Sequence, residues 1–244
     1  MLSKKLLKDI QSLSHKKHRE DTGLFVAEGP KVVEELARQI PQQVVSIYAL
    51  EEWMTQNQHS FQHLPVELVS SQELERISQL QTPNQVLMVA KQLPSHEPVL
   101  NNELALYLDT VQDPGNLGTI IRAADWFGIK NIVCSKGSAD CYNTKVVQST
   151  MASLARVNVW YDNNEDWLQK QTVPLLAAAL EGESVYSFKK LAAAILLIGN
   201  ESKGLRPELL QLSTQKLTIP RIGQAESLNA AVAVAILLSH LTNK

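Results

Sequence analysis

The stretch Lys216–Leu241, KLTIPRIGQAESLNAAVAVAILLSHL, decides how the C-terminal half of the chain is organised. A short apolar run around Leu217 and Ile219 predicts a strand, followed by a loop that contains Pro and Gly. We expect Ser227 to be the N-cap of the next helix, because its hydroxyl can accept from a first-turn N–H. Asn229 then falls in the first turn, although Asn is a poor helix former. The pattern is typical of a binding edge, and an ordinary crossover with an incidental Asn fits it equally well.

Outward from this stretch, the second half of the chain alternates apolar runs with helical segments. We expect strands at 104–109, 131–135, 156–161, 174–180 and 193–198, and helices at about 119–127, 144–154 and 162–170. Continuous apolar runs between helices indicate a parallel sheet that is covered on both faces. The predicted fold class of this half is therefore α/β.

The first half follows the same alternation on a smaller scale. Strands are expected near 23–28, 44–50, 66–69 and 85–91, and helices near 2–14, 30–38, 51–56 and 70–79. Ser70 and Glu73 have the spacing of a capping box at the start of the last of these helices. The segment 93–103 has two Pro, two Asn and no periodicity, which is typical of a linker. We therefore predict a small α/β domain at 1–97 and a larger domain at 98–244.

The composition excludes several classes of protein. Of the 244 residues, 44% are hydrophobic and 20% are charged, as in ordinary globular domains. No apolar run approaches the length of a membrane helix, and the N-terminus lacks the apolar core of a signal peptide. Cys134 and Cys141 have no further Cys partners, which argues against a disulfide framework or a zinc site. We expect a cytoplasmic protein without membrane or metal.

The N-terminus carries a local excess of positive charge. Residues 1–20 contain six basic and two acidic residues, although the whole chain has a net charge of −2. The bases Lys16, Lys17 and Arg19 are candidates for contacts with RNA phosphates. A solvated helix face is the other interpretation of such a cluster.

Three expected strands end in polar loops that contain Gly, at 109–122, 198–205 and 219–229. In open parallel sheets, ligands bind beyond the carboxyl ends of the strands. The loops lack G-x-G-x-x-G after the first strand and lack a P-loop, which disfavours a standard dinucleotide or nucleoside triphosphate site.

Together the three loops resemble the SpoU family of RNA ribose 2′-O-methyltransferases, within the knotted SPOUT superfamily. The residues that match its three motifs are Asn116 and Arg122, then Gly199, Glu201 and Gly204, then Ile219, Pro220, Gly223, Ser227, Leu228 and Asn229. The first half resembles the family's N-terminal RNA-binding domain, of the ribosomal-protein-L30-like type, through Lys16–Arg19 and Gly23–Leu36. One departure is Ala152, where the family often has Gly.

The resemblance implies a C-terminal domain with a deep trefoil knot, S-adenosylmethionine bound in the knot, and a homodimer whose active site lies at the interface. The substrate would be rRNA or tRNA. Residues implied to hold the cofactor are Ile198, Gly199, Ile219, Leu228 and Asn229.

Within that resemblance, Arg122 is expected at the ribose oxygen. Because Arg is effectively always protonated, we assign it a cationic role instead of that of a general base. Asn116, Ser227 and Asn229 would orient the Arg and the ribose, and Glu201 would pair with a cation or a ribose group.

Three alternatives stay open at this point. The same scaffold could methylate a base instead of a ribose. A catalytically silent RNA-binding protein could keep the fold. A nucleotide-binding α/β enzyme could use the loops in another way.

Overall fold

The computed structural model describes residues 1–189 and 191–242. Contacts within the chain divide it into two units. The first unit comprises Met1–Pro94 and Tyr142–Ala155, and the second comprises Ser95–Cys141 and the described part of Arg156–Lys244. No helix in the described ranges is long and apolar enough to cross a membrane.

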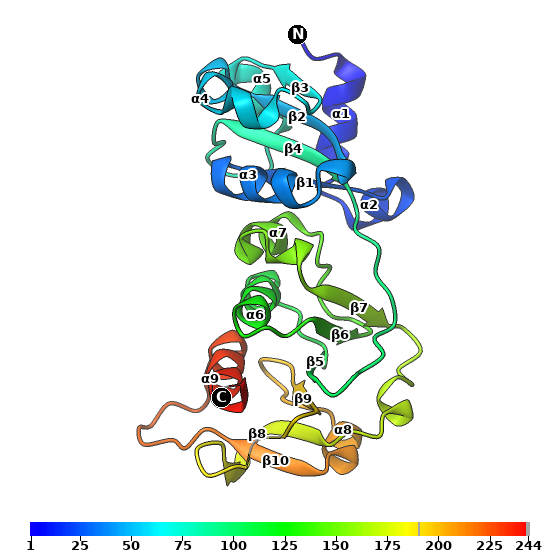
Figure 1. The fold of residues 1–244 in the computed structure, drawn as a ribbon, viewed down its shortest axis with the longest axis vertical. Coiled ribbons are helices and arrows are strands. Elements are labelled where there is room, and N and C mark those ends of the chain that lie inside the picture. The colour runs from blue at the N-terminus through cyan, green and yellow to red at the C-terminus, as the bar shows by residue number, and fades with distance from the viewer. Residues whose placement is uncertain (190, 243–244) are drawn as a thin grey trace. The chain divides into compact units, whose positions relative to one another are not determined.

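A four-stranded mixed sheet organises the first unit, in the order β1-β4-β2-β3 (Figure 1). Its strands are β1 (Leu24–Glu28), β2 (Val44–Ala49), β3 (Val66–Leu68) and β4 (Val86–Lys91). Strand β4 runs antiparallel to β1 and β2, whereas β2 and β3 are parallel. These strands lie where the apolar runs of the first half predict them.

Five helices accompany this sheet within Met1–Pro94. They are α1 (Lys4–Ser12), α2 (Lys16–Thr22), α3 (Pro30–Gln39), α4 (Glu51–Phe61) and α5 (Ser71–Ile77), with a 3₁₀ turn at Pro41–Gln43. The predicted capping box at the start of α5 is confirmed: Ser70 Oγ accepts from the Glu73 N–H, and Glu73 accepts from the Ser70 N–H.

A later helix, α7 (Thr144–Thr150), also belongs to the first unit, where it packs against β1. Just before it, the Tyr142 ring lies 4.9 Å from the Phe25 ring, and the Gln148 amide donates to the Glu28 carbonyl at 2.8 Å. The first unit therefore includes a segment that the sequence analysis assigned to 98–244. The boundary near residue 97 lies three residues beyond Pro94 and stays a prediction.

A six-stranded parallel sheet organises the second unit, in the order β10-β8-β9-β5-β6-β7. The strands are β5 (Leu104–Leu108), β6 (Asn131–Ser135), β7 (Asn158–Asp162), β8 (Leu175–Ser184), β9 (Ala194–Ile198) and β10 (Gln215–Thr218). The prediction of an α/β fold with a parallel sheet is confirmed. The core includes Tyr107 and Trp167, whose rings stack 6.4 Å apart.

The helices of the second unit are α6 (Pro114–Trp126), α8 (Pro207–Leu212) and α9 (Ala230–Thr242), with a 3₁₀ turn at Leu168–Lys170. The prediction of a helix at 162–170 is wrong. Strand β7 runs to Asp162, whose buried carboxylate accepts from the Trp167 N–H at 3.0 Å and so stabilises a turn instead.

Candidate functional site

The loops after β5 and β9 are neighbours because the two strands pair side by side. Strand β5 pairs with β9 in register from Leu104 to Leu108, and the Asp109 N–H then donates to the Ile198 carbonyl at 2.7 Å. The structure therefore brings the first and second motif segments together at the carboxyl edge of the sheet, as the topology predicts.

Helix α6 begins earlier than the sequence analysis expects. Asp113 is its N-cap and accepts from the Asn116 N–H at 2.8 Å, while Pro114 occupies the first turn. Asn116 therefore lies in the first turn of a helix, and its placement in a loop is corrected. The Asp-Pro pair at 113–114 was the signal in the sequence for this start.

Helix α9 begins later than expected, and its N-cap is Asn229. The Asn229 Oδ1 accepts from the N–H groups of Ala231 and Val232 at 2.9 and 3.2 Å. The assignment of Ser227 as the cap is wrong, because Ser227 lies two residues before the cap in an exposed segment. This explains why a poor helix former stands at position 229, since Asn is among the best N-caps.

Asn116, Glu201 and Asn229 form one hydrogen-bonded chain, which we call the amide chain. The Asn229 Nδ2 donates to Asn116 Oδ1 at 2.7 Å, and the Asn116 Nδ2 donates to Glu201 Oε1 at 2.9 Å. Because Asn229 Oδ1 already caps α9, the orientation of each amide is fixed by its neighbour. The three motif segments, far apart in sequence, are joined here through their side chains.

The loop at 199–206, which we call the β9 loop, folds tightly on itself. Asn200 and Gly204 exchange two backbone hydrogen bonds at 3.0 and 2.9 Å, and Gly204 has a φ of +69°. A Cβ on Gly199 would lie 2.2 Å from the Gly204 carbonyl carbon, so only glycine fits there. Asn200, which the sequence analysis did not select, donates to the Thr110 carbonyl at 2.7 Å and so ties the loop to the end of β5.

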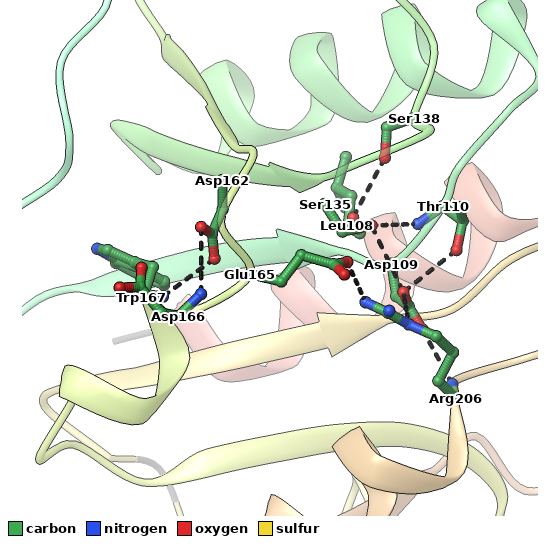
Figure 2. Close-up of polar contacts among 10 residues, drawn as sticks. All are labelled: Leu108, Asp109, Thr110, Ser135, Ser138, Asp162, Glu165, Asp166, Trp167 and Arg206. Carbon is green, nitrogen blue, oxygen red and sulfur yellow. Dashed lines mark hydrogen bonds and ion pairs between the residues drawn. The ribbon is translucent and has the colours of Figure 1, made fainter.

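A buried carboxylate anchors the end of the β9 loop. Asp109 is fully buried, and it accepts from the Arg206 N–H at 2.9 Å and from Arg206 Nε at 2.8 Å. Figure 2 shows the Arg206 guanidinium held between Asp109 and Glu165, whose Oε1 lies 2.7 Å from Nη2. The bond to Glu165 and the charge of Asp109 raise the pKa of Arg206 further above its ordinary value. The sequence gives no signal for a pair 97 residues apart.

Arg122 is exposed on α6 and is not part of the amide chain. No described residue makes a hydrogen bond or ion pair with its guanidinium. A surface salt bridge to Asp125 or Glu201 is the alternative role for Arg122, but Asp125 pairs with Arg156 at 2.7 Å and Glu201 accepts from Asn116. Arg122 follows Asn116 by six residues, which places their side chains about 120° apart around the helix axis.

The residues expected to hold the cofactor occupy different environments. Ile198 is buried at the end of β9, Ile219 is half-buried after β10, and Leu228 is 47% exposed. From Ile219 to Leu228, no backbone N–H donates a hydrogen bond within the described ranges. This exposed segment therefore presents free backbone N–H groups beside apolar side chains, and such donors can bind the polar edge of a ligand such as adenine.

The N-terminal bases divide into two kinds. Lys16 and Lys17 are exposed, and Lys16 Nζ lies 3.7 Å from Glu20 in a solvated pair. Arg19 is only 2% exposed, and its Nη1 donates to the Leu13 and Ser14 carbonyls at 2.7 and 2.9 Å. The assignment of Arg19 to RNA phosphates is corrected, because its guanidinium is buried against the end of α1.

The described part of the chain holds no group of three or more His, Cys, Asp or Glu that could bind a metal ion. Cys134 and Cys141 are buried and form no disulfide, and burial raises the pKa of the Cys134 thiol. Neither thiol is exposed as a nucleophile.

Comparison with known proteins gives matches over both halves of the chain. Residues 103–239 match the SpoU rRNA Methylase family, and residues 4–88 match the MRM3-like substrate binding domain. The chain is 34% identical over 239 residues to the 23S rRNA (guanosine(2553)-2′-O)-methyltransferase RlmP of Bacillus subtilis, covering 96% of this chain and 95% of that protein.

Solved structures agree with these matches. A proposed RNA methyltransferase of the TrmH family from Porphyromonas gingivalis has 37% identity and a TM-score of 0.85, covering 99% of this chain and 98% of its own. An AdoMet-bound rRNA methyltransferase from Sinorhizobium meliloti has 30% identity and a TM-score of 0.84, covering 99% and 95%. The resemblance seen in the three motifs is confirmed: the chain belongs to the SpoU rRNA methylase family.

Proposed function

We propose that this protein transfers a methyl group from S-adenosylmethionine to the ribose 2′-hydroxyl of a nucleotide in 23S rRNA. The relative from Bacillus subtilis carries that activity in its name, and the structure from Sinorhizobium meliloti is described as AdoMet-bound. The observation that carries the proposal is the amide chain, which joins the three motif segments at one edge of the parallel sheet. An incidental Asn in an ordinary crossover would have no reason to make these bonds.

S-adenosylmethionine supplies an electrophilic methyl group on a positively charged sulfur, which leaves as a neutral thioether. The exposed segment at 219–228 and the tight β9 loop are the parts of this chain that fit it. Backbone groups of Gly199, Ile219 and Leu228 would bind the polar edges of adenine and ribose, and Ile198 would cover an apolar face. Asn229, as the cap of α9, fixes where that segment ends.

The protein's remaining task is to place the 2′-oxygen in line with the methyl–sulfur bond and to stabilise the charge that develops on it. Arg122 is the cation that we assign to this oxygen. The amide chain fixes the edge of the site, with Glu201 as its terminal acceptor and Ser227 in the adjoining exposed segment. A water or RNA phosphate would take the proton, because a guanidinium already carries all of its protons.

A homodimer with its active site at the interface explains why Arg122 lies apart from the amide chain in one copy. Helix α9 is apolar along nearly its whole length, and Val232 on its outer face is 47% exposed. Beside it lies an open groove of about 530 Å³, lined by Thr119 of α6, residues of α9 and the 60% exposed Tyr186. An apolar helix with an uncovered face favours burial against a second copy. Arg122 neighbours Thr119 on α6, one turn along.

We further propose the trefoil knot, an L30-like fold for the first domain, a domain boundary near residue 97 and a cytoplasmic location. The knot is supported by the path of the chain after β10. From that edge strand the chain returns to pack α9 against α6, and Asn229 donates to Asn116, which in turn donates to Glu201. The first domain would bind RNA, with Lys16 and Lys17 as exposed phosphate contacts.

The proposal is tested by comparing the wild type with Arg122→Ala in methyl transfer from labelled S-adenosylmethionine to unmodified 23S rRNA. We expect a loss of about 10²–10³ in rate, the usual cost of removing one group that stabilises developing charge. Cofactor affinity by calorimetry should be unchanged. Full activity in the variant would remove Arg122 from the mechanism, and no transfer by the wild type would refute the proposed substrate.

A further inference from the structure

A second hollow lies between the segment that joins β5 to α6 and the β9 loop, which carries Glu201. It has a volume of about 210 Å³ and is lined by Thr110 and Gln112 after β5 and by residues of the β9 loop through Pro207. Residues 112 and 116 belong to one segment, and residues 201 and 203 to the other. Because consecutive Cα atoms are about 3.8 Å apart, the backbone at 203 lies within about 8 Å of that at Glu201.

The lining of this pocket is cationic. Lys203 and Arg206 both line it, and no carboxylate does. Arg206 uses Nε and Nη2 on Asp109 and Glu165, which leaves Nη1 without an acceptor in the described ranges. The Lys203 ammonium likewise has no hydrogen bond or ion pair with any described residue. Asp109 and Glu165 thus hold the guanidinium plane in place from outside the pocket wall, and this preorganises its remaining donors.

Two of the other polar side chains of the lining, Thr110 and Asn200, already have partners. Asn200 donates to the Thr110 carbonyl, and its Oδ1 accepts from the N–H groups of Ser202 and Lys203. Asn200 therefore shapes the pocket. The lining side chains that keep free donors among the described residues are the two cations and the neutral amide of Gln112. Phosphate oxygens are the anionic acceptors that an RNA strand offers beside every ribose.

We propose that this pocket binds an RNA phosphate next to the target ribose, with Lys203 and Arg206 as its cationic donors. The inference rests on the proposed function and adds a substrate subsite to it. Arg206 is fixed by its two carboxylates, whereas Lys203 is exposed at the rim and can be replaced without removing a packed contact.

The test replaces Lys203→Gln in the full chain and compares it with Lys130→Gln. Lys130 is also exposed, but it precedes β6 and therefore lies at the opposite, amino edge of the parallel sheet. The probe is unmodified 23S rRNA transcribed in vitro. Binding is measured from 50 to 200 mM KCl, methyl transfer gives KM and kcat, and calorimetry gives the affinity for S-adenosylmethionine.

Each phosphate contact contributes about 0.7–0.9 to the slope of log affinity against log salt, which corresponds to about four- to sixfold at 0.15 M salt. Lys203→Gln should therefore weaken RNA binding and raise KM by about fivefold, reduce the slope by nearly one and leave kcat unchanged. Lys203→Arg should retain wild-type values, and Lys130→Gln should match the wild type.

The pocket assignment is overturned if Lys203→Gln behaves like Lys130→Gln, or if it weakens cofactor binding by the same factor as RNA binding. The measurement of RNA binding separates this outcome from a failure of the proposed function. A wild type that binds the transcript without methylating it refutes the function, while a reduced salt slope in Lys203→Gln still supports the phosphate site.

Discussion

Asn229 has two separable roles, and the pair of variants Asn229→Ala and Asn229→Asp distinguishes them. Its Oδ1 caps α9 through two bonds, whereas its Nδ2 donates to Asn116. Alanine removes both roles. Aspartate keeps the cap, because Asp and Asn are equally good N-caps, and it replaces the amide donor with a second acceptor.

The stability effect follows from the cap. Loss of an N-cap costs about 1 kcal/mol, which in a domain of this size lowers Tm by about 2–4 °C. Asn229→Ala should show that shift. Both variants also lose the bond to Asn116. Asn229→Asp should therefore have a Tm about 2–4 °C above that of Asn229→Ala, because its carboxylate keeps the cap and interacts favourably with a helix N-terminus.

The effect on activity follows from the amide chain. In Asn229→Asp, two acceptors meet across a contact that is 2.7 Å in the wild type. If the Asn116 amide turns to donate to the new carboxylate, its oxygen then faces Glu201 instead. One hydrogen bond of about 1–1.5 kcal/mol is lost in either arrangement, and the edge of the site shifts. We expect methyl transfer to fall about 10- to 100-fold in both variants.

Differential scanning fluorimetry and the methyl-transfer assay with unmodified 23S rRNA measure the two effects on the same preparations. More than half of wild-type activity in Asn229→Asp would refute the role of the amide chain. A Tm of Asn229→Asp as low as that of Asn229→Ala would refute the assignment of Asn229 as the cap.

Three further predictions concern the first unit. Arg19→Ala should lower the free energy of unfolding by about 1–3 kcal/mol, because two carbonyls lose a buried donor. Lys17→Ala should leave urea unfolding unchanged and instead reduce the salt slope of RNA binding. Equal stability losses in the two variants would contradict the assignment of Arg19 as structural and Lys17 as a phosphate contact. Ala152→Gly should stabilise the protein by about 0.5–1 kcal/mol in urea unfolding, because Ala152 has a φ of +70°; a loss would show that the buried methyl group matters more. Hydrogen bonds from the N–H groups of Ser70 and Leu2 lower the pKa of Glu73 to about 2. The stability that the Glu73 carboxylate gives the fold is therefore fully present above about pH 4.5 and is lost as the pH falls towards 2. The Tm difference between wild type and Glu73→Gln should shrink from pH 7 to pH 3, and a constant difference would contradict this linkage.

Much of the fold could be predicted because its signals are local. Apolar runs of strand length between helices indicated the parallel sheet, and the spacing of Ser70 and Glu73 indicated the start of α5. Asn229 could be selected because an Asn among small apolar residues has no role in core packing, whereas Asn116, Glu201 and Ser227 were selected through the resemblance of the three loops to the SpoU family. Asn116, Glu201 and Asn229 do meet at one edge of the sheet.

The remaining features depend on contacts between distant residues. Ser227 and Asn229 are both good caps by residue type. The structure distinguishes them, because Asn229 Oδ1 accepts from the first turn of α9 while its Nδ2 donates to the distant Asn116. Asp109 and Arg206 are brought together by the pairing of β5 with β9, which their local sequences do not reveal. The basic run likewise does not show that Arg19 turns inward to the end of α1.

Location of the transferred methyl group tests the central claim most directly. Unmodified 23S rRNA is incubated with the protein and labelled S-adenosylmethionine and then hydrolysed in alkali, which spares only the linkage after a 2′-O-methylated ribose. Ribose methylation predicts that the label is recovered in one alkali-resistant dinucleotide and, after complete digestion, on the sugar. Label recovered on a base, in mononucleotides released by alkali, would contradict ribose methylation.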